Sequence, residues 1–572
     1  MIHYSISYQN PHRHFIDISL NFQPNKSEDK VFLQLPSWRP GRYELADFSK
    51  NIQKLSAFDQ NNNEFEVFKI NKDRWCLDLQ NVQTDNITIK YNFYANQLDA
   101  GSTYLDENQL YVNPVNCCLY VEGKESDECN IELKIPNDYK IACGLNQTKN
   151  VLFAKNYDQL AESPFIASST LKHAHYSCNN HTFHLWFQGD TNSNFKKIVD
   201  DFKSFTIEQL NNFDSFPVSD YHFLFQLTPY KSYHGVEHTN STVILLGSDK
   251  NTLVDRYEDL LGICSHELYH TWNIKAIRPS EMLPYDYTKE NYSKLGYVAE
   301  GVTTYMGDLM LVRSKVFNWN QFVKTQNENL KRHYENDGRF NLSVADSSFD
   351  TWLDGYTLGI PNRKTSIYTE GALNMLMIDL SIIHHSEAKY SLHTVMNDLY
   401  IHFAKKNIGY TEKDFIDLCA KYGGSDVLNV INDHIYDTKD YTKSLEKCLN
   451  YVGIKLEKTP NPNLSARFFG FICLELNNKL IVKKVQNNSL IENNGVAVED
   501  ELMKIDDKKV TSKNIQQLLE NKEKVKLTFK NRFSKFSITV PTNGNFYSIY
   551  KMIKNNDATK EQMQLQSTWL NN

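Results

Sequence analysis

The pentapeptide His-Glu-Leu-Tyr-His at residues 266–270 constrains the fold of this chain more than any other feature. Residues 253–264 carry apolar side chains at helical spacing, which predicts that the pentapeptide lies on a helix. On a helix, His266 and His270 are one turn apart and point the same way, as two imidazole ligands of one zinc ion must. Glu300 begins a second apolar segment of helical periodicity. If Glu300 is the third ligand, the chain must bring these two segments together.

Two histidines and one glutamate leave one coordination position open for water, the arrangement of a catalytic zinc site. Glu267 stands beside the histidines and is predicted to take a proton from that water. The alternative is that the string occurs by chance and that the histidines are ordinary core residues. The helical context and the Glu-Gly pair at residues 300–301 favour the zinc site. We therefore expect one zinc ion per chain.

Length and charge exclude several classes of protein. A chain of 572 residues is too long for one core, so two to four domains are expected. The formal net charge of −7 offers no broad basic surface. This argues against nucleic acid or an anionic membrane as the main partner.

The first ten residues lack a basic region followed by an apolar core, so no signal peptide is expected. The most apolar later stretch, residues 372–383, is too short for a membrane span and contains Asp379. Ten cysteines without an export signal are most simply reduced thiols, which indicates a cytoplasmic location.

Hydrophobic patterning predicts a multidomain α+β fold. Residues 1–168 alternate apolar and polar side chains between turns and predict an N-terminal β domain. The Pro- and Gly-rich segment 35–43 is interpreted as a rigid corner of that domain. Residues 169–458 predict a catalytic domain, with a short sheet that leads into a helical lobe. Pro460 and Pro462 mark a linker, and strand patterns return at residues 464–545 around a short helix near 514–520. Residues 546–572 are predicted to be a polar tail.

Three motifs resemble the glycyl aminopeptidase family of gluzincin metallopeptidases (peptidase family sixty-one). They are Pro-Ser-Trp-Arg-Pro-Gly-Arg-Tyr at 36–43, the zinc helix with its Trp-Asn and Arg-Pro extension at 266–279, and Glu-Gly-Val-Thr-Thr-Tyr at 300–305. The resemblance implies an N-terminal β-sandwich-like domain and a thermolysin-like catalytic domain with a small sheet and a helical lobe. It also implies an aminopeptidase that acts on peptides with a free N-terminus.

Residues 233–238, Tyr-His-Gly-Val-Glu-His, resemble a family motif of two glycines, an apolar residue and Glu-His. The resemblance implies that Glu237 holds the α-amino group of the substrate and that Gly235 and His238 belong to the substrate-binding segment. A buried ammonium group needs a carboxylate partner, which gives the role a physical basis. His234 stands where the family has its first glycine. The alternative is that Glu237 is an ordinary loop carboxylate.

Residues 366–373, Ser-Ile-Tyr-Thr-Glu-Gly-Ala-Leu, resemble a segment whose tyrosine faces the reacting oxygen of the substrate. The resemblance implies that Tyr368 stabilises the oxyanion. Glu370 stands where the family usually has lysine, and a reversed charge near the site would change specificity. The alternative is that Tyr368 is one of many tyrosines that pack in the core.

Residues 464–545 are similar to a PDZ domain, with Arg-Phe-Phe-Gly-Phe-Ile at 467–472 as its carboxylate-binding turn. Glu499 replaces the usual glycine of such domains, and Asp507-Lys508 replaces the usual Asn-Gly. A PDZ groove captures a C-terminal peptide by adding it as a strand. The alternative is a degenerate module that only packs on the catalytic domain.

The favoured hypothesis is a zinc aminopeptidase that removes N-terminal glycine or other small residues. A second hypothesis is a gluzincin endopeptidase, in which Glu237 is structural. A third is a PDZ-bearing binding or chaperone-like protein with a vestigial metal site. The intact set of His266, Glu267, His270 and Glu300 argues against the third.

Overall fold

The computed structural model describes residues 1–25, 29–80, 82, 84–191, 195–248, 251–357 and 359–571. Its contacts group the chain into two compact units. The first contains Met1–Asn318, Phe349–Tyr356 and His393–Leu418, and the second contains Trp319–Ser348, Thr357–Leu392 and Cys419–Asn572. The predicted domain boundaries at residues 168 and 458 fall inside these units and stay predictions.

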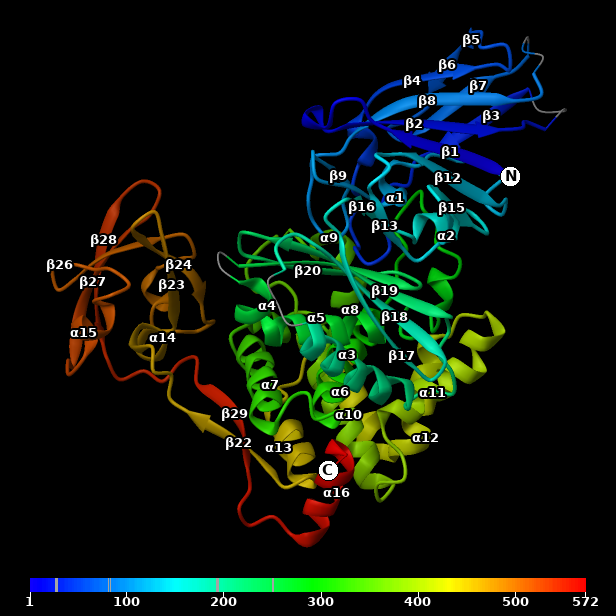
Figure 1. The fold of residues 1–572 in the computed structure, drawn as a ribbon. Helices are drawn as coiled ribbons and strands as arrows, with labels where there is room; N and C mark the ends of the chain where they lie inside the picture. The colour runs from blue at the N-terminus through cyan, green and yellow to red at the C-terminus, as the bar shows by residue number, and fades with distance from the viewer. Residues whose placement is uncertain are drawn as a thin grey trace. The chain divides into compact units, whose positions relative to one another are not determined.

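The N-terminal part of the first unit is rich in β-sheet, as the alternating sequence pattern predicts (Figure 1). Its largest sheet has eight strands in the order β14-β15-β12-β1-β2-β8-β4-β5. These strands are β1 (Ile2–Ser7), β2 (Phe15–Phe22), β4 (Ile52–Phe58), β5 (Glu64–Phe65), β8 (Ile87–Tyr94), β12 (Cys129–Lys134), β14 (Asn146–Thr148) and β15 (Val151–Ala154). In β1, Ile2, Tyr4 and Ile6 are buried while His3 and Ser5 between them are more exposed, because successive side chains of a strand point to opposite faces.

Two four-stranded sheets complete this region, in the orders β11-β3-β7-β6 and β13-β16-β10-β9. Their strands are β3 (Lys30–Gln34), β6 (Val67–Lys69), β7 (Arg74–Asp78), β9 (Tyr104–Leu105), β10 (Leu110–Val112), β11 (Tyr120–Val121), β13 (Lys140–Cys143) and β16 (Phe165–Ser168). Short helices lie between them: η1 (Pro11–Arg13), η2 (Phe48–Asn51), α1 (Pro114–Cys117) and α2 (Tyr157–Ala161). All three sheets contribute to one hydrophobic core, to which Leu20, Leu33 and Phe165 belong.

The catalytic part of the first unit is built around a five-stranded sheet of order β17-β18-β19-β21-β20. Its strands are β17 (Lys172–Cys178), β18 (His181–Gln188), β19 (Asp220–Thr228), β20 (Ser232–Glu237) and β21 (Ser241–Gly247). The three inner strands are parallel, and the antiparallel strand β20 forms one edge. On one face, the rings of Phe223 and Phe225 pack against Phe202 of α3 (Phe195–Leu210). The short sheet that the sequence predicts here is thus confirmed.

The helix that carries the pentapeptide is α5 (Tyr257–Tyr269), and His270 caps its C-terminus with helical dihedral angles. Glu300 lies in a single π-helical turn (Tyr297–Val302) that leads into α6 (Thr303–Arg313). Such turns often occur at functional sites. A Cβ atom at Gly307 of α6 would lie 3.1 Å from the His266 Cα atom, so the glycine allows α5 and α6 to approach closely.

The remaining helices of the first unit are short. They are α4 (Thr252–Asp255), η3 (Ser280–Met282), α9 (Thr351–Asp354), α11 (Leu392–His402) and η6 (Ala404–Lys406). Trp38 of the predicted corner at 35–43 is buried. Its indole ring lies 5.1 Å from that of Trp352, and its N–H donates a hydrogen bond to the Asp286 carbonyl. The corner is therefore joined to the catalytic part of the unit as well as to the β domain.

Helices dominate the first half of the second unit. They include α7 (Trp319–Tyr334), η5 (Asp337–Phe340), α8 (Val344–Phe349), α10 (Thr369–His385), η7 (Ile431–Ile435) and α13 (Thr442–Tyr451). The residues of α12 (Glu412–Val430) are divided between the two units after Leu418. The predicted polar tail at 546–572 is wrong. Strand β29 (Ile549–Lys554) pairs with β22 (Ile454–Thr459), and α16 (Lys560–Leu570) packs Trp569 against Phe322 of α7. A few apolar residues among many polar ones are enough to anchor this segment.

The C-terminal module forms a sheet of order β23-β24-β25-β27-β28, with β26 paired to β25. Its elements are α14 (Leu464–Phe469), β23 (Phe471–Leu476), β24 (Lys479–Val485), η8 (Glu492–Asn494), β25 (Glu501–Ile505), β26 (Lys508–Lys509), α15 (Ile515–Leu519), β27 (Lys524–Lys530) and β28 (Lys535–Pro541). The predicted strands from residue 480 onwards and the short helix near 514–520 are confirmed.

The start of this module differs from the prediction of a carboxylate-binding turn at 467–472. Residues 467–469 lie in α14, because the Asn463 side chain accepts hydrogen bonds from the Ser465 and Ala466 amides and caps the helix. The Arg467 amide donates to the Asn463 carbonyl at 2.9 Å, and the Gly470 amide donates to the Ala466 carbonyl at 3.0 Å. These two amides therefore already donate hydrogen bonds to carbonyls of the chain itself.

Within the described residues, no helix has the length and apolar character needed to cross a membrane. All ten cysteines lie in the described ranges and none forms a disulfide. Nine of their side chains are buried, which agrees with their prediction as free thiols.

Candidate metal centre and active site

Three predicted ligands come together between α5 and the π-helical turn. The Nε2 atoms of His266 and His270 are 3.0 Å apart, and Glu300 Oε2 lies 3.6 Å and 3.4 Å from them. Ligands at about 2.0–2.1 Å from one tetrahedral zinc ion lie about 3.3 Å from each other. The donor set, its spacing and its burial therefore fit a zinc ion. The side chains of His270 and Glu300 are only 2% and 3% exposed, whereas that of His266 is 20% exposed.

The orientation of His270 is set by the backbone that follows α5. His270 Nδ1 lies 2.9 Å from the Asn273 carbonyl and donates to it, which leaves Nε2 with a lone pair for the metal. Burial alone would raise the pKa of Glu300, but the facing histidines outweigh it and hold this pKa well below its ordinary value. Glu300 is therefore an ionised carboxylate, the form in which it binds a cation.

Asn273 holds the two ligand-bearing segments together, a role that the sequence did not reveal. Its side-chain amide donates to the Val298 carbonyl at 2.8 Å, to the Ala299 carbonyl at 3.1 Å and to Thr303 Oγ1 at 3.0 Å. These groups flank Glu300 in the π-helical turn. One buried side chain thus links the end of the zinc helix to the segment that carries the third ligand.

Glu267 is buried next to the edge strand of the sheet. A Cβ atom at Gly235 of β20 would lie 2.2 Å from Glu267 Oε1, so only glycine lets the strand pass here. Glu267 Oε2 has no hydrogen-bond partner among the described residues. Burial raises the pKa of Glu267 above its ordinary value, and Glu237 and Glu300 add to the effect while His270 opposes it. A carboxylate with a raised pKa is a stronger base toward water.

Glu237 ends strand β20 and is 5% exposed. Its carboxylate meets the corner at 35–43, because a Cβ atom at Gly41 would lie 2.6 Å from Glu237 Oε2. Gly41 has a φ of +82°, a conformation that glycine adopts without strain. One carboxylate oxygen of Glu237, one of Glu267 and one nitrogen of His270 lie within 4.8 Å of one another. The predicted amino-group anchor is therefore next to the predicted base.

The corner contributes more to the site than its prediction as a structural element implied. Tyr43 is buried, and its burial together with the charges of Glu300 and Glu237 raises the pKa of its phenol well above the ordinary value. The Tyr43 amide donates to the Tyr356 hydroxyl at 3.3 Å. The Pro- and Gly-rich pattern indicated rigidity, but it gave no sign that a phenol from this segment faces Glu300.

His238 and His234 lie close to Glu237 in the sequence, on either side of it. Among the described residues, neither ring nitrogen of the buried His238 has a hydrogen-bond partner. Burial, reinforced by Lys275 and Arg39, lowers the pKa of His238 well below its ordinary value, so the ring is neutral. His234 Nδ1 accepts a hydrogen bond from the Ala100 amide at 3.3 Å. The residue that replaces the family's glycine is thus tied to the β domain.

Tyr368 and Glu370 belong to the second unit. Tyr368 precedes the first turn of α10 and is 37% exposed, and its predicted role stays a prediction. Glu370 is buried in α10, where it accepts from the Ser366 amide at 2.9 Å and lies 3.4 Å from His333 Nδ1. The carboxylate that stands in place of lysine therefore has partners inside its own unit.

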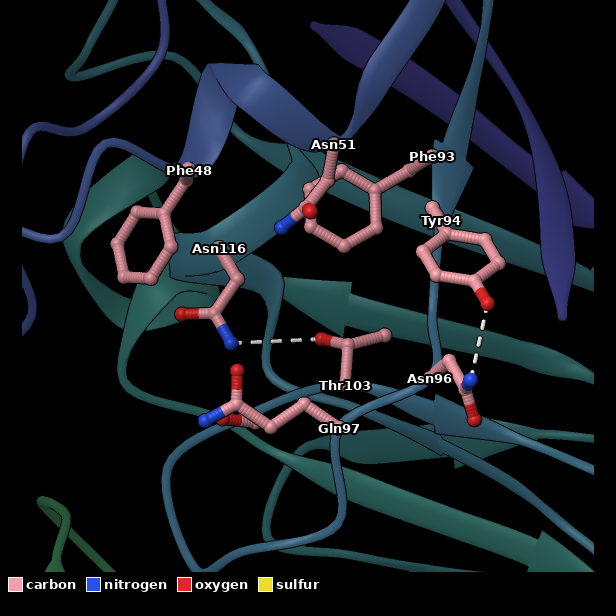
Figure 2. Close-up of a pocket in the computed structure, with 9 residues that line it drawn as sticks. Phe48, Asn51, Phe93, Tyr94, Asn96, Gln97, Thr103 and Asn116 are labelled. Carbon is pink, nitrogen blue, oxygen red and sulfur yellow. Dashed lines mark hydrogen bonds between the residues drawn. The ribbon is translucent and has the colours of Figure 1, made fainter.

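A separate pocket of about 170 Å³ lies in the N-terminal part of the first unit (Figure 2). Nine residues line it, and aromatic rings, amides and hydroxyls make up its wall: Phe48, Asn51, Phe93, Tyr94, Asn96, Gln97, Ser102, Thr103 and Asn116. None of the nine is an acid, a histidine, a cysteine or a basic residue. The pocket lacks the groups that metal-assisted hydrolysis needs, in contrast to the cluster around His270.

Comparison with known proteins agrees with this geometry. Residues 3–169 match the model of the peptidase M61 N-terminal domain, and residues 259–374 match that of the M61 glycyl aminopeptidase. The chain carries two M61 peptidase domains. The second match includes the pentapeptide and Glu300, so the predicted metallopeptidase of the aminopeptidase type is confirmed.

The chain is also similar to solved structures. An aminopeptidase N family protein from Idiomarina loihiensis shares 27% identity over 100% of both chains, with a TM-score of 0.91. A mutant M1 zinc metallopeptidase from Deinococcus radiodurans bound to a Tyr-Ser-Ala substrate shares 11% identity, over 77% of this chain and 94% of that one, with a TM-score of 0.46. No curated protein sequence matches the chain.

Proposed function

We propose that this protein is a zinc-dependent aminopeptidase that removes N-terminal glycine or other small residues from peptides. The observation that carries the proposal is the group of His266, His270 and Glu300, whose ligand atoms lie 3.0–3.6 Å apart. The match to an M61 glycyl aminopeptidase supports the preference for a small first residue.

His266, His270 and Glu300 would hold the zinc ion, which supplies a Lewis acid that activates water for attack on a peptide carbonyl. Glu267 accepts the proton of the attacking water and then passes a proton to the leaving amine. Its raised pKa, which burial and the neighbouring carboxylates cause, suits both steps. The tight approach of Gly235 keeps the Glu267 side chain in one place.

Glu237 restricts the reaction to the first peptide bond. Its buried carboxylate is next to Glu267, and it offers a partner for the ammonium group at the start of a peptide. A charged group that leaves water needs such a partner, so the ammonium places the first residue of the substrate beside the zinc ligands. His238 and the backbone at Gly235 would line this part of the substrate site.

We expect the purified protein to bind zinc at its catalytic site, and we expect His270→Ala to lose that metal and peptide hydrolysis together. The substitution removes one of three protein ligands, and with it the imidazole that the Asn273 carbonyl holds in place. Elemental analysis after remetallation, with hydrolysis of glycine-initiated peptides in parallel, measures both. His3→Ala, at an exposed histidine of β1, is the control and should behave like the unaltered protein. Full metal binding and activity in His270→Ala would refute the assignment.

For the C-terminal module we propose a PDZ-like fold that binds the C-terminus of a peptide along β23. Strand β23 lies at one edge of its sheet, and an edge strand is where an added peptide pairs. A peptide with a free C-terminal carboxylate should then bind more tightly than the same peptide with a C-terminal amide, as fluorescence anisotropy measures. Equal binding of the two, or none, would contradict a PDZ-like role.

A further inference from the structure

A second group of metal-binding side chains lies on the five-stranded sheet, outside the candidate active site. His184 of β18 and His222 of β19 are directly paired in the parallel register of these strands. Asp220 is two residues before His222, so its side chain points to the same face. The parallel pairing thus brings two imidazoles and a carboxylate together from two neighbouring strands.

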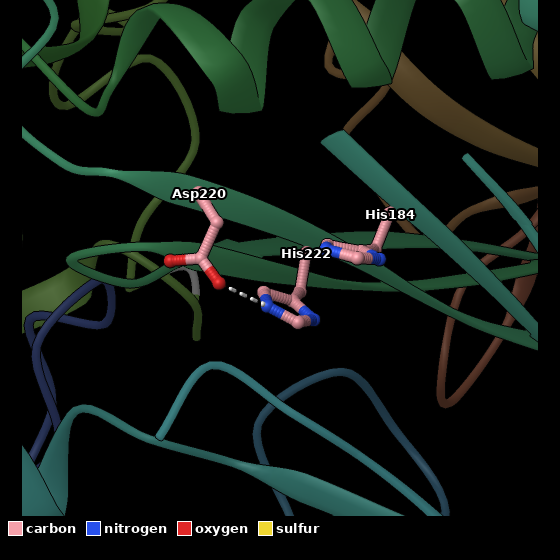
Figure 3. A group of neighbouring side chains, drawn as sticks. All are labelled: His184, Asp220 and His222. Carbon is pink, nitrogen blue, oxygen red and sulfur yellow. Dashed lines mark hydrogen bonds and ion pairs between the residues drawn. The ribbon is translucent and has the colours of Figure 1, made fainter. Parts of the chain in front are cut away.

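The three side chains lie next to one another, with the His222 ring between Asp220 and His184 (Figure 3). One oxygen of Asp220 and one nitrogen from each of His184 and His222 lie within 4.8 Å of one another. His222 Nε2 is 3.1 Å from Asp220 Oδ2, close to the separation of about 3.3 Å between two ligands of one tetrahedral ion. The rings of His184 and His222 stack with centroids 4.5 Å apart, so the His184 ring must turn for its free nitrogen to face the same ion.

His184 already has the outer partner that a metal-bound imidazole needs. Its Nδ1 lies 3.0 Å from Nε2 of His173 on the adjacent strand β17, which leaves His184 Nε2 for a cation. A bond from the second ring nitrogen fixes the tautomer and the ring plane of a metal-binding histidine.

Four histidines gather on this face of the sheet. His173, His175, His184 and His222 lie on one face of strands β17, β18 and β19, and Lys140 is close to His173.

We propose that His184, His222 and Asp220 form a second metal site, which takes a divalent transition-metal ion of the zinc class. Two imidazole nitrogens and one carboxylate oxygen are the ligands that such ions prefer. The side chain of Asp220 is 38% exposed, so the ion reaches the site from solvent and exchanges with it. The ion would join β18 to β19, and binding to the folded state alone stabilises that state.

Trp186 opposes this site and keeps its affinity low. Its indole N–H donates to His222 Nδ1 at 3.2 Å, so in the metal-free protein the ring carries its proton on Nε2, which faces Asp220. A metal ion at Nε2 displaces that proton, and a neutral ring then carries its proton on Nδ1, opposite the indole donor. Metal binding therefore costs the Trp186–His222 hydrogen bond.

The experiment is a calorimetric titration of the full-length protein with zinc chloride, after one equivalent of zinc has been bound. We expect the unaltered protein to take up a second, weaker equivalent. His184→Ala and Asp220→Asn should lose the second equivalent and keep both the first and the rate of peptide hydrolysis. His3→Ala, an exposed histidine elsewhere in the first unit, should keep both equivalents. Trp186→Phe should bind the second equivalent about 10-fold more tightly, the size of effect that outer partners of metal ligands have.

Two results would overturn the proposal. One is a single equivalent of zinc in the unaltered protein that both His184→Ala and Asp220→Asn retain. The other is a second equivalent that survives in both His184→Ala and Asp220→Asn. Because the readout is the loss of one equivalent upon these substitutions, it does not depend on the zinc aminopeptidase proposed above. If the catalytic site bound no zinc, the titration would still show whether His184 and Asp220 bind it.

Discussion

Glu267→Gln is expected to keep zinc bound and to lower kcat by about 10²- to 10⁴-fold, the usual contribution of a general base. The amide has the shape of the carboxylate but cannot accept a proton from water. The shape matters here because the Gly235 backbone passes directly against Glu267 Oε1, so a larger or branched replacement would displace the edge strand. Glutamine therefore tests the chemistry of this position and leaves the packing in place.

Zinc content and steady-state kinetics on a glycine-initiated peptide measure this outcome together. Glu258→Gln is the matched control, because Glu258 lies on the same helix with its side chain exposed, and it should retain the full rate. Near-normal turnover in Glu267→Gln would remove this residue from the mechanism. Loss of zinc in the same variant would show that the carboxylate acts through the metal site instead.

Glu237→Ala is expected to lower kcat/KM on peptides with a free amino terminus by about 30-fold to several thousand-fold. The loss of one partner from a buried charge pair costs roughly 2–5 kcal/mol, and this cost corresponds to the expected fall in kcat/KM. The position is 5% exposed and enclosed by Gly41 of the corner, so water replaces the carboxylate poorly. Glu237→Gln keeps the volume of the side chain and removes its charge, so it should show most of the same loss.

The loss should depend on the charge of the substrate. Any residual cleavage of acetylated peptides should be unchanged or improved in Glu237→Ala, because these peptides bring no ammonium group to the site. Comparing kcat/KM for a free peptide and its acetylated form, in both Glu237 variants, separates an aminopeptidase from an endopeptidase. Equal losses on the two substrates would make Glu237 a structural residue and favour the endopeptidase.

Local sequence patterns predicted the elements of the site, because helix and strand periodicity depend on neighbouring residues. The apolar spacing before His266 predicted α5, and the alternation in residues 1–168 predicted a sheet-rich domain. Predictions from local sequence patterns failed where a capping residue or a few scattered apolar residues decided the structure. Asn463 begins a helix where a PDZ-like turn was expected, and scattered apolar residues anchor the segment that was predicted to be a tail.

By itself, the sequence determined which atoms could bind a metal and that His266 and His270 share one helical face, since both follow from residue type and a 3.6-residue period. Only the tertiary structure decided which distant groups meet these ligands. Asn273 reaches the turn that carries Glu300, and Gly41 encloses Glu237 from a corner almost 200 positions earlier in the chain. The parallel register likewise pairs His184 with His222, which no local spacing connects. Such contacts depend on how whole sheets and helices pack, and a period along the chain holds no information about them.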